Sequence, residues 1–290
     1  MDEPQIALPC LRRRQAGRSV YGCRAGSVAG SRTVGSRSIG RISTAGAGTE
    51  PRSSGARLPV LLTSAIRVAA PFTKMSDAAE RTAAAVRAIS VWMTMCRDTE
   101  FVFCDGSGYD VSRDLEACRA IDTSRIEVVT FENDRDQVRI KGKGFGEGQI
   151  TKYALENSSI LKSAKSFAKC TGKLWVDNFW DCRRSYNGTA GFSHFGFLSV
   201  HAIDTRFFIV QKKFFEDNLL ESYVGCDDSR GRYLENVYLD SLTAIDRKAW
   251  MLPVYPRIRG LSGTSGEEYR GGMVKQLGKN LAIRLLRTVR

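Results

Sequence analysis

One segment of the chain sets alternating glycines and two lysines directly before an amphipathic helical pattern. It reads KGKGFGEGQITKYAL and spans residues 141–155. A flexible loop that ends at a helix start exposes backbone N–H groups and the positive end of the helix dipole, which suits a phosphate. The spacing matches neither the G-x-G-x-x-G dinucleotide fingerprint nor the G-x-x-x-x-G-K-[ST] P-loop. A mobile loop without a ligand is the alternative interpretation. The candidate phosphate contacts are Lys143, Gly144, Gly146 and Glu147.

A second segment, CDGSGYD at 104–110, ends a run of strand-forming residues. A carboxylate at a strand end, here Asp105, could accept hydrogen bonds from a base or from ribose hydroxyls. The glycine that follows, Gly106, would let a flat base approach the backbone. An ordinary turn closed by an aspartate side chain explains the same residues without a ligand.

A third segment, KCTGK at 169–173, places two lysines around a Thr-Gly turn. Lys169 and Lys173 would form an anion site with Thr171 and Gly172, and the segment contains no carboxylate pair for a divalent metal. If a diphosphate leaves at this point, the two lysines must neutralise it.

Charged residues nearer the C-terminus could complete a site for group transfer. A predicted helix at 232–242 carries Glu235 and Asp240, either of which could act as a catalytic base, although helix-surface carboxylates are commonly just solvated. The segment 257–269 is rich in glycine and hydroxyl residues and could close over an anionic substrate or be an ordinary mobile tail. The residues expected at an acceptor or closing loop are Asp204, Arg206, Arg257 and Arg259.

The elements that must position these segments alternate between strands and helices. Hydrophobic runs predict strands, and apolar residues at helical spacing predict helices. The strands are expected at 58–66, within 100–110, at 126–134 and at 166–179, and the segment 205–223 is expected to be a strand that turns into a helix. Further helices are expected at 76–95, 113–121, 149–164 and 232–242. This alternation predicts a three-layer α/β/α domain with a mostly parallel central sheet. Ligands bind such sheets at the carboxyl ends of the strands, where the polar glycine segments fall.

The positive charge of the chain is distributed unevenly. Residues 1–57 contain ten arginines, no lysine and three acids, so they contribute +7 of the net +13. Few large apolar residues occur there, which predicts a disordered extension. The composition of this extension resembles that of an organellar transit peptide. It equally suits an over-extended gene start, and we favour this second interpretation. We expect one domain at 58–275 and a basic helix or tail at 276–290.

Composition narrows the class of protein further. The eight cysteines form no C-x-x-C pair, and only two histidines occur, so we expect reduced thiols, no metal site and a cytoplasmic chain. No apolar run is long enough to span a membrane. The modest charge of the remaining 233 residues fits an enzyme that handles nucleotides, acidic lipids or polyanions, and it does not by itself call for nucleic acid.

Taken in order, VLLTSAI, FVFCDGSGYD, IEVVTF, GKGFGEGQITKYALENS and AKSFAKCTGKLWVDNF resemble the pattern of bacterial glycosyltransferases of GT-A type over residues 58–270. The resemblance implies that Thr63 and Ser64 lie near a nucleotide, Asp105 at its base or ribose, and Lys143 to Glu147 by the sugar phosphate. In that family an Asp-x-Asp motif usually holds a metal, and here KCTGK stands in its place.

The leading hypothesis is a glycosyltransferase without a cofactor or metal. It would move a sugar from a nucleotide-sugar donor to a cell-surface glycan or a lipid-linked saccharide, with peripheral contact to a membrane. Asp105 would bind the nucleotide, Lys169 and Lys173 the leaving phosphate, and Glu235 or Asp240 the acceptor hydroxyl. The alternatives are a nucleotide-dependent methyltransferase and a non-catalytic module that binds anions or glycans. The oligomeric state is not predicted.

Overall fold

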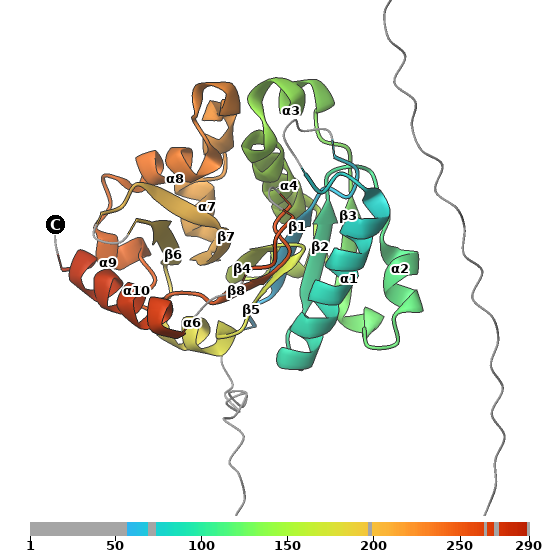
Figure 1. Ribbon diagram of the computed structural model, residues 1–290, viewed down its shortest axis with the longest axis horizontal. Helices are drawn as coiled ribbons and strands as arrows, with labels where there is room; N and C mark the ends of the chain where they lie inside the picture. Colours follow the sequence, from blue (N-terminus) through green and yellow to red (C-terminus); the bar gives the residue numbers. More distant parts are fainter. Residues whose placement is uncertain (1–56, 69–73, 197–198, 264–265, 270–272, 289–290) are drawn as a thin grey trace, which may run out of the picture. The chain divides into compact units, whose positions relative to one another are not determined.

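The computed structural model describes residues 57–68, 74–196, 199–263, 266–269 and 273–288, all within one compact unit, Ala47–Arg290 (Figure 1). Except for Arg57, the predicted N-terminal extension lies outside the described residues. The strands are β1 (Val60–Ser64), β2 (Phe101–Asp105), β3 (Ile126–Thr130), β4 (Ser166–Thr171), β5 (Leu174–Val176), β6 (Ala190–Phe195), β7 (Ala202–Gln211) and β8 (Ile258–Gly260).

Helices connect most of these strands. The α-helices are α1 (Ala78–Met95), α2 (Ser112–Ala117), α3 (Arg135–Lys141), α4 (Lys143–Asn157), α5 (Ser159–Ser163), α6 (Phe179–Ser185), α7 (Lys212–Asn218), α8 (Leu234–Leu242), α9 (Arg247–Trp250) and α10 (Met273–Leu286). Short 3-10 turns are η1 (Thr123–Arg125), η2 (Ser222–Gly225) and η3 (Asp228–Arg230). The capping signal before α1 is confirmed, because the Asp77 carboxylate accepts a hydrogen bond from the Glu80 N–H at 2.8 Å.

The central sheet has six strands in the order β3-β2-β1-β4-β7-β6. Its first four strands are parallel, and β1, between β2 and β4, is buried along its whole length. Such a strand needs apolar side chains on both faces, which explains the continuous run VLL. Two apolar cores flank the sheet, one beneath α1, α2 and α6, the other beneath α4, α7 and α8. The predicted α/β/α class and mostly parallel sheet are therefore confirmed.

The other end of the sheet differs from the prediction. β7 runs antiparallel to β4, and β6 pairs with β7 as an antiparallel edge strand that the sequence pattern did not reveal. The segment that forms β6, AGFSHF, alternates small and aromatic residues without a strong β-branched run. The strand expected at 166–179 also ends early, at Thr171. There the Gly172 N–H donates to the Thr63 carbonyl at 2.7 Å, and the chain then turns into β5, which pairs with β8 in a separate small sheet.

The glycine row at 142–148 is not a loop. Gly142, with a φ of 95°, separates α3 from α4, and the next three glycines lie inside α4. A Cβ on Gly148 would lie 2.1 Å from the Cβ of Tyr223, and one on Gly146 would lie 3.0 Å from the Asn133 side chain. Close packing of the first turns of α4 therefore explains these glycines.

Candidate active site

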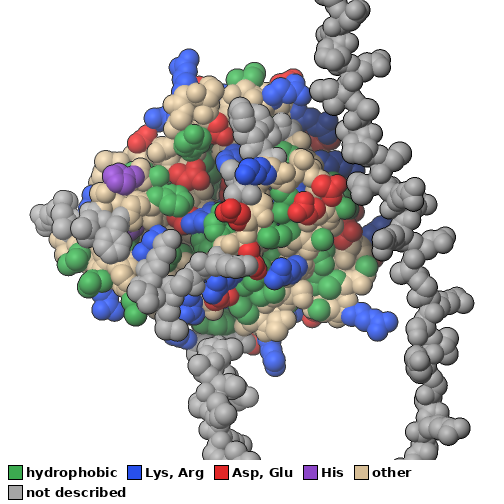
Figure 2. Space-filling model, viewed as in Figure 1, with side chains coloured by type: hydrophobic (Ala, Val, Ile, Leu, Met, Phe, Trp, Pro, Cys, Tyr) green, Lys and Arg blue, Asp and Glu red, His purple; other side chains and the backbone are tan. Residues whose placement is uncertain are grey.

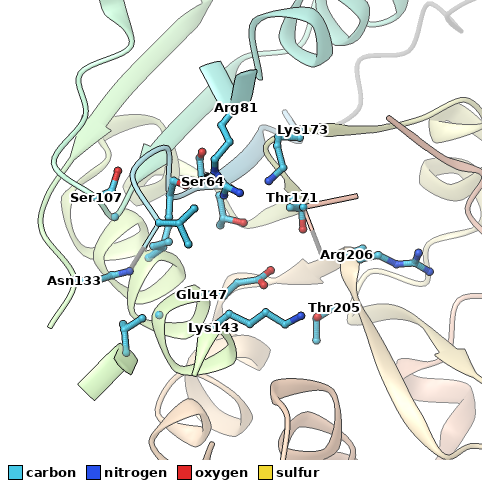
Figure 3. Close-up of a pocket in the computed structure, with 18 of the residues that line it drawn as sticks. Ser64, Arg81, Ser107, Asn133, Lys143, Glu147, Thr171, Lys173, Thr205 and Arg206 are labelled. Atoms are coloured by element: carbon cyan, nitrogen blue, oxygen red, sulfur yellow. Dashed lines mark hydrogen bonds between the residues drawn. The ribbon is translucent and has the colours of Figure 1, made fainter. Parts of the chain in front are cut away.

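A cavity of about 690 Å³ opens where the parallel strands β1, β2 and β4 end. Its walls come from the loops after these strands, from α1, α4, β7 and α8, and from the segment that follows β8. Figure 3 shows Arg81 and Lys173 on one side of this space, with Glu147 and Lys143 opposite. The site therefore lies at the sheet edge that the sequence indicated.

Unpartnered polar atoms gather at the β1 and β3 side of the cavity. Thr63 and Ser64 are buried at the end of β1, and Asn133 follows β3. Among the described residues, the hydroxyls of Thr63 and Ser64 and the Oδ1 atom of Asn133 have no hydrogen-bond partner. Buried polar atoms without partners are costly, so these three are available to a polar ligand. Asn133 was not predicted as a site residue, because the strand was expected to extend to residue 134, whereas β3 ends at Thr130.

Asp105 lies behind this wall rather than in it. One carboxylate oxygen accepts from the Ile66 N–H at 2.8 Å, and the other accepts from the N–H and hydroxyl of Ser107 at 2.8 and 2.5 Å. The side chain is fully buried and does not line the cavity. Asp105 thus joins the loops after β1 and β2, while the adjacent Gly106 and Ser107 do line the cavity.

Arg81 and Lys173 form the cationic side of the cavity. The Arg81 guanidinium donates from Nε to the Ala65 carbonyl at 2.8 Å and from Nη1 to the Met75 carbonyl at 2.9 Å. Lys173 is 6% exposed, and burial together with the nearby Arg81 charge lowers its pKa to about 8. Among the described residues neither side chain forms an ion pair, so both keep a charge for a bound anion.

Gly263 lies over the two cations. A Cβ at this position would be 3.2 Å from the Lys173 Nζ atom and 3.5 Å from the Arg81 Nη1 atom. Leu261, Ser262 and Tyr269 of the same segment also line the cavity. The segment expected to close over an anion therefore borders the cationic side.

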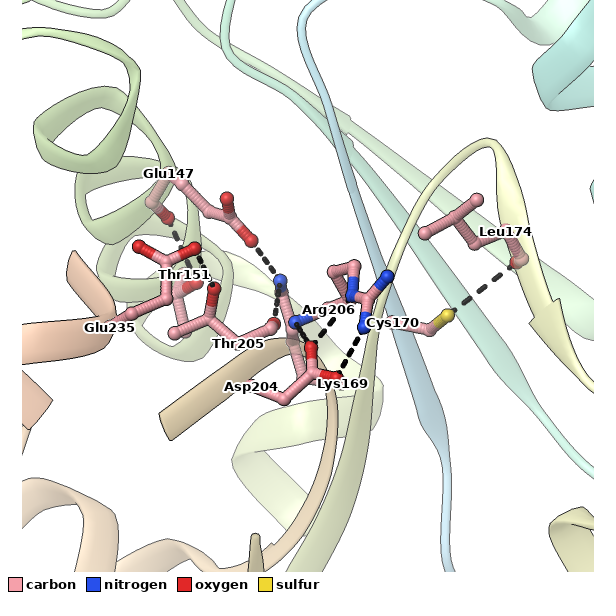
Figure 4. Close-up of polar contacts among 9 residues, drawn as sticks. All are labelled: Glu147, Thr151, Lys169, Cys170, Leu174, Asp204, Thr205, Arg206 and Glu235. Atoms are coloured by element: carbon pink, nitrogen blue, oxygen red, sulfur yellow. Dashed lines mark hydrogen bonds and ion pairs between the residues drawn. The ribbon is translucent and has the colours of Figure 1, made fainter. Parts of the chain in front are cut away.

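Lys169, by contrast, makes its polar contacts inside the fold. Its side chain is 1% exposed and forms an ion pair with Glu147 of α4, and its Nζ atom also donates to the Thr205 carbonyl at 2.7 Å (Figure 4). It therefore holds α4 against β4 and β7 and does not line the cavity. The structure separates the two lysines of KCTGK, because Lys169 lies within β4 whereas Lys173 follows the turn at Gly172, beyond the end of the strand.

Glu235 brings a second carboxylate into the cavity. The first turn of α8 presents it beside β7, and its Oε1 atom accepts a hydrogen bond from the Thr205 hydroxyl at 3.1 Å. Burial and the negative charge of Glu147 raise the pKa of Glu235 above the ordinary value. A carboxylate with a raised pKa that faces a cavity is suited to accept a proton from a substrate hydroxyl.

Arg206 marks the end of the cavity beyond these carboxylates. Its Nε and Nη2 atoms bind both oxygens of the buried Asp204 at 2.8 and 2.6 Å. The guanidinium also lies over the rings of Phe195 and Tyr269, at 5.3 and 4.8 Å from their centroids. Asp204 therefore neutralises this end of the cavity, and aromatic rings border it.

Several predicted residues lie outside the cavity lining. Asp240 points to solvent on α8 and pairs with Arg232 at 2.9 Å, and Arg259 pairs with Asp177 at 2.8 Å. The Arg257 N–H donates to Asn178 at 2.7 Å. Gly144 packs against Leu234, while Gly172 lies beside the β1 backbone. The predicted residues that line the cavity are Thr63, Ser64, Gly106, Lys143, Gly146, Glu147, Thr171, Lys173, Arg206 and Glu235.

No protein-family model and no curated protein matches the chain. Among solved structures, the apo bifunctional glycosyltransferase WbbM aligns with a TM-score of 0.43 at 10% identity, over 82% of this chain and 45% of its own. The galactosyltransferase LgtC, in complex with donor and acceptor sugar analogues, aligns with a TM-score of 0.40 at 12% identity, over 63% of this chain and 70% of its own. The mannosyltransferase Ktr4p from S. cerevisiae, in complex with GDP, aligns with a TM-score of 0.43 at 11% identity, over 83% of this chain and 87% of its own.

These neighbours are glycosyltransferases, the class that the order of the sequence segments resembles. This chain spans less than half the length of the WbbM chain.

A divalent metal does not fit the residues at the end of β4. The family pattern expects an Asp-x-Asp motif there, and this chain has Thr171, Gly172 and the buried ammonium of Lys173. The described residues include no group of three or more histidine, cysteine or acidic side chains that could hold a metal ion. Because a buried cation repels a second one, Lys173 disfavours a divalent metal ion at the end of β4.

Charge elsewhere on the domain is mixed. On the face shown in Figure 2, basic and acidic side chains are interspersed over the described part of the surface. The cavity instead combines seven cations with two carboxylates, Glu147 and Glu235; the cations are Arg67, Arg81, Arg135, Arg139, Lys143, Lys173 and Arg206. An anionic small molecule is the ligand that this lining favours.

Proposed function

We propose that this protein is a glycosyltransferase that uses a nucleoside diphosphate sugar as donor and neutralises the leaving diphosphate with protein cations instead of a metal. The observation that carries the proposal is the distribution of charged side chains within one cavity. Arg81 and Lys173 lie on one side without ion-pair partners among the described residues. Glu147 and Lys143 lie opposite, and Glu235 is hydrogen-bonded to Thr205, which lines the same cavity. A donor with an anionic and an uncharged half is complementary to such a cavity.

The donor would lie along the strand ends. Its base and ribose would contact the unpartnered atoms of Thr63, Ser64 and Asn133, and its diphosphate would contact Arg81, Lys173 and the Thr171 hydroxyl. In transfer, the bond between the anomeric carbon and the phosphate oxygen breaks, and its electron pair leaves with the diphosphate. Arg81 and Lys173 stabilise that developing charge.

Glu235 would act on the acceptor. The acceptor hydroxyl forms the new bond to the anomeric carbon, and its proton passes to the Glu235 carboxylate. Lys169 holds Glu147 next to this carboxylate, and the neutralised Arg206–Asp204 pair borders the same space. That end of the cavity therefore favours an uncharged saccharide over a second anion, either as a free glycan or as the sugar of a lipid-linked acceptor.

The experiment is to incubate the purified protein with UDP-, GDP- and CMP-linked sugars in EDTA and measure nucleotide release by mass spectrometry. We expect release from a nucleoside diphosphate sugar, loss of release in Lys173→Met, and no effect of Lys213→Met, which changes an exposed lysine on α7. Binding without turnover would support a non-catalytic anion module instead. Binding of S-adenosylmethionine, with no sugar nucleotide bound, would support a methyltransferase.

A further inference from the structure

Helix α10 presents an apolar stripe to solvent. Leu277, Leu281 and Leu285 occur every four residues and are 66%, 61% and 52% exposed. Three other apolar side chains of the helix, Ala282, Ile283 and Leu286, are buried in the domain. One apolar face of α10 is therefore buried in the domain, while three leucines on a second face are more than half exposed within the described part of the chain.

The surroundings of this stripe are basic. Residues 269–290 contain six lysines and arginines and no acidic residue. Arg284, which lies about one turn after Leu281 and directly before Leu285, is exposed, and Lys248 of the neighbouring α9 is exposed as well. Arg287 joins the two helices, because its Nη2 atom donates to the Lys248 carbonyl at 3.4 Å. The one acidic neighbour on α9 is Asp246, which caps that helix.

We propose that the leucine stripe of α10 docks on an anionic lipid surface. Exposed leucines that lie along a helix among cations are complementary to acyl chains beneath anionic headgroups. A second copy of the chain fits less well, because a two-fold contact through the stripe would bring Arg284 against its own equivalent. Among the described residues, no helix combines the length and the hydrophobicity that a bilayer span requires.

The position of α10 connects this surface with the cavity. Ala282 and Ile283 pack beside His194 of β6, and the next residue of that strand, Phe195, lines the cavity next to Arg206. A membrane beneath α10 would therefore lie nearest the end of the cavity assigned to the acceptor. This consequence, a lipid-linked acceptor, rests on the proposed function, whereas the docking surface itself does not.

The test is sedimentation of the full chain with vesicles of phosphatidylcholine alone or mixed with phosphatidylglycerol. The test variant replaces Leu277, Leu281 and Leu285 with glutamine, which keeps the helical propensity. The control replaces Ile140 of α3 and Val224 of η2, which are 65% and 50% exposed, with glutamine. We expect the test variant to lose binding to the mixed vesicles about tenfold or more and the control to bind like the parent. High salt should weaken the binding of the parent.

A second measurement separates α10 from the arginine-rich residues 1–57, which could also attract anionic vesicles. In Leu281→Trp, brominated acyl chains should quench the added tryptophan well beyond the quenching of the parent. The proposal would be overturned if Leu281→Trp were quenched no more than the parent, or if the triple variant bound the mixed vesicles as well as the parent. It would also be overturned if the parent bound both kinds of vesicle equally. A parent dimer that the triple variant converts to a monomer, without vesicle binding, would assign the stripe to a second copy. None of these readouts uses a sugar nucleotide, so they fail independently of the proposed function.

Discussion

The Glu235 carboxylate accepts a hydrogen bond from the Thr205 hydroxyl at 3.1 Å. The carbonyl of the same Thr205 accepts one from the buried Lys169, which in turn pairs with Glu147. One residue of β7 thus links the candidate base on α8 to the ion pair between β4 and α4. The position of Glu235 therefore depends on three elements of the fold, none of which is adjacent to α8 in sequence.

Replacing this carboxylate should affect turnover more than donor binding. Glu235→Gln keeps an oxygen that can accept from Thr205 but cannot take a proton, so we expect kcat to fall about 10²- to 10⁴-fold. Asp240→Asn is the matched control, because it changes an exposed carboxylate on the same helix. Steady-state transfer kinetics would measure both, and equal effects of the two substitutions would remove Glu235 from the mechanism.

The pH profile of transfer should report the raised pKa of Glu235. A general base works in its ionised form, so activity is present above its pKa and is lost as pH falls through it. Burial and the Glu147 charge raise the pKa above the ordinary glutamate value of 4.5. We therefore expect the acidic limb of kcat/KM to have its midpoint above 4.5, and Glu235→Gln to abolish this limb. An acidic limb that the substitution leaves intact would contradict the assignment.

Lys173 should destabilise the ligand-free domain. Its pKa of about 8 in the folded state lies below the ordinary 10.5, so the folded state binds its proton more weakly than the unfolded state. The resulting loss of folding stability is fully present below pH 8 and decreases as pH rises toward 10.5. Lys173→Met should thus raise the free energy of unfolding at pH 7, by up to about 3 kcal/mol. Urea denaturation at pH 7 and pH 10 would show this gain shrinking with pH; an equal gain at both values would contradict the buried charge.

Removal of Lys169 should have the opposite effect on stability. Lys169→Met leaves Glu147 without its partner beside Glu235, and we expect a loss of about 3 kcal/mol in the free energy of unfolding. The double variant Lys169→Met, Glu147→Gln should recover most of this loss, because no unpaired charge remains. A double-mutant cycle in urea measures the coupling, and additive losses would show that the ion pair does not stabilise the domain.

The sequence was sufficient to predict the fold class because the first four strands are short apolar runs that end in polar glycine segments. Their carboxyl ends lie at one edge of the sheet, so Thr63, Gly106 and Thr171 come together as expected. The antiparallel strands β6 and β7 were harder to place, since an antiparallel pairing depends on long-range contacts that no local pattern records.

The candidate site could be predicted only in part, because a residue type does not show which way its side chain points. Lys169 and Lys173 look equivalent in KCTGK, yet one is bound within the fold and the other faces the cavity. Arg81 was missed, although it falls at helical spacing with the buried Ala85, Ile89 and Trp92. A cation on the apolar face of α1 was the available signal.

Calorimetric titration of UDP and GDP in EDTA is the most direct test of the central claim, that Arg81 and Lys173 bind the diphosphate without a metal. We expect saturable binding of one nucleotide in EDTA, and a loss of affinity of about tenfold or more in Lys173→Met, with Lys213→Met unchanged. Absence of binding for every nucleotide until a divalent metal is added, or equal affinity in Lys173→Met, would contradict it.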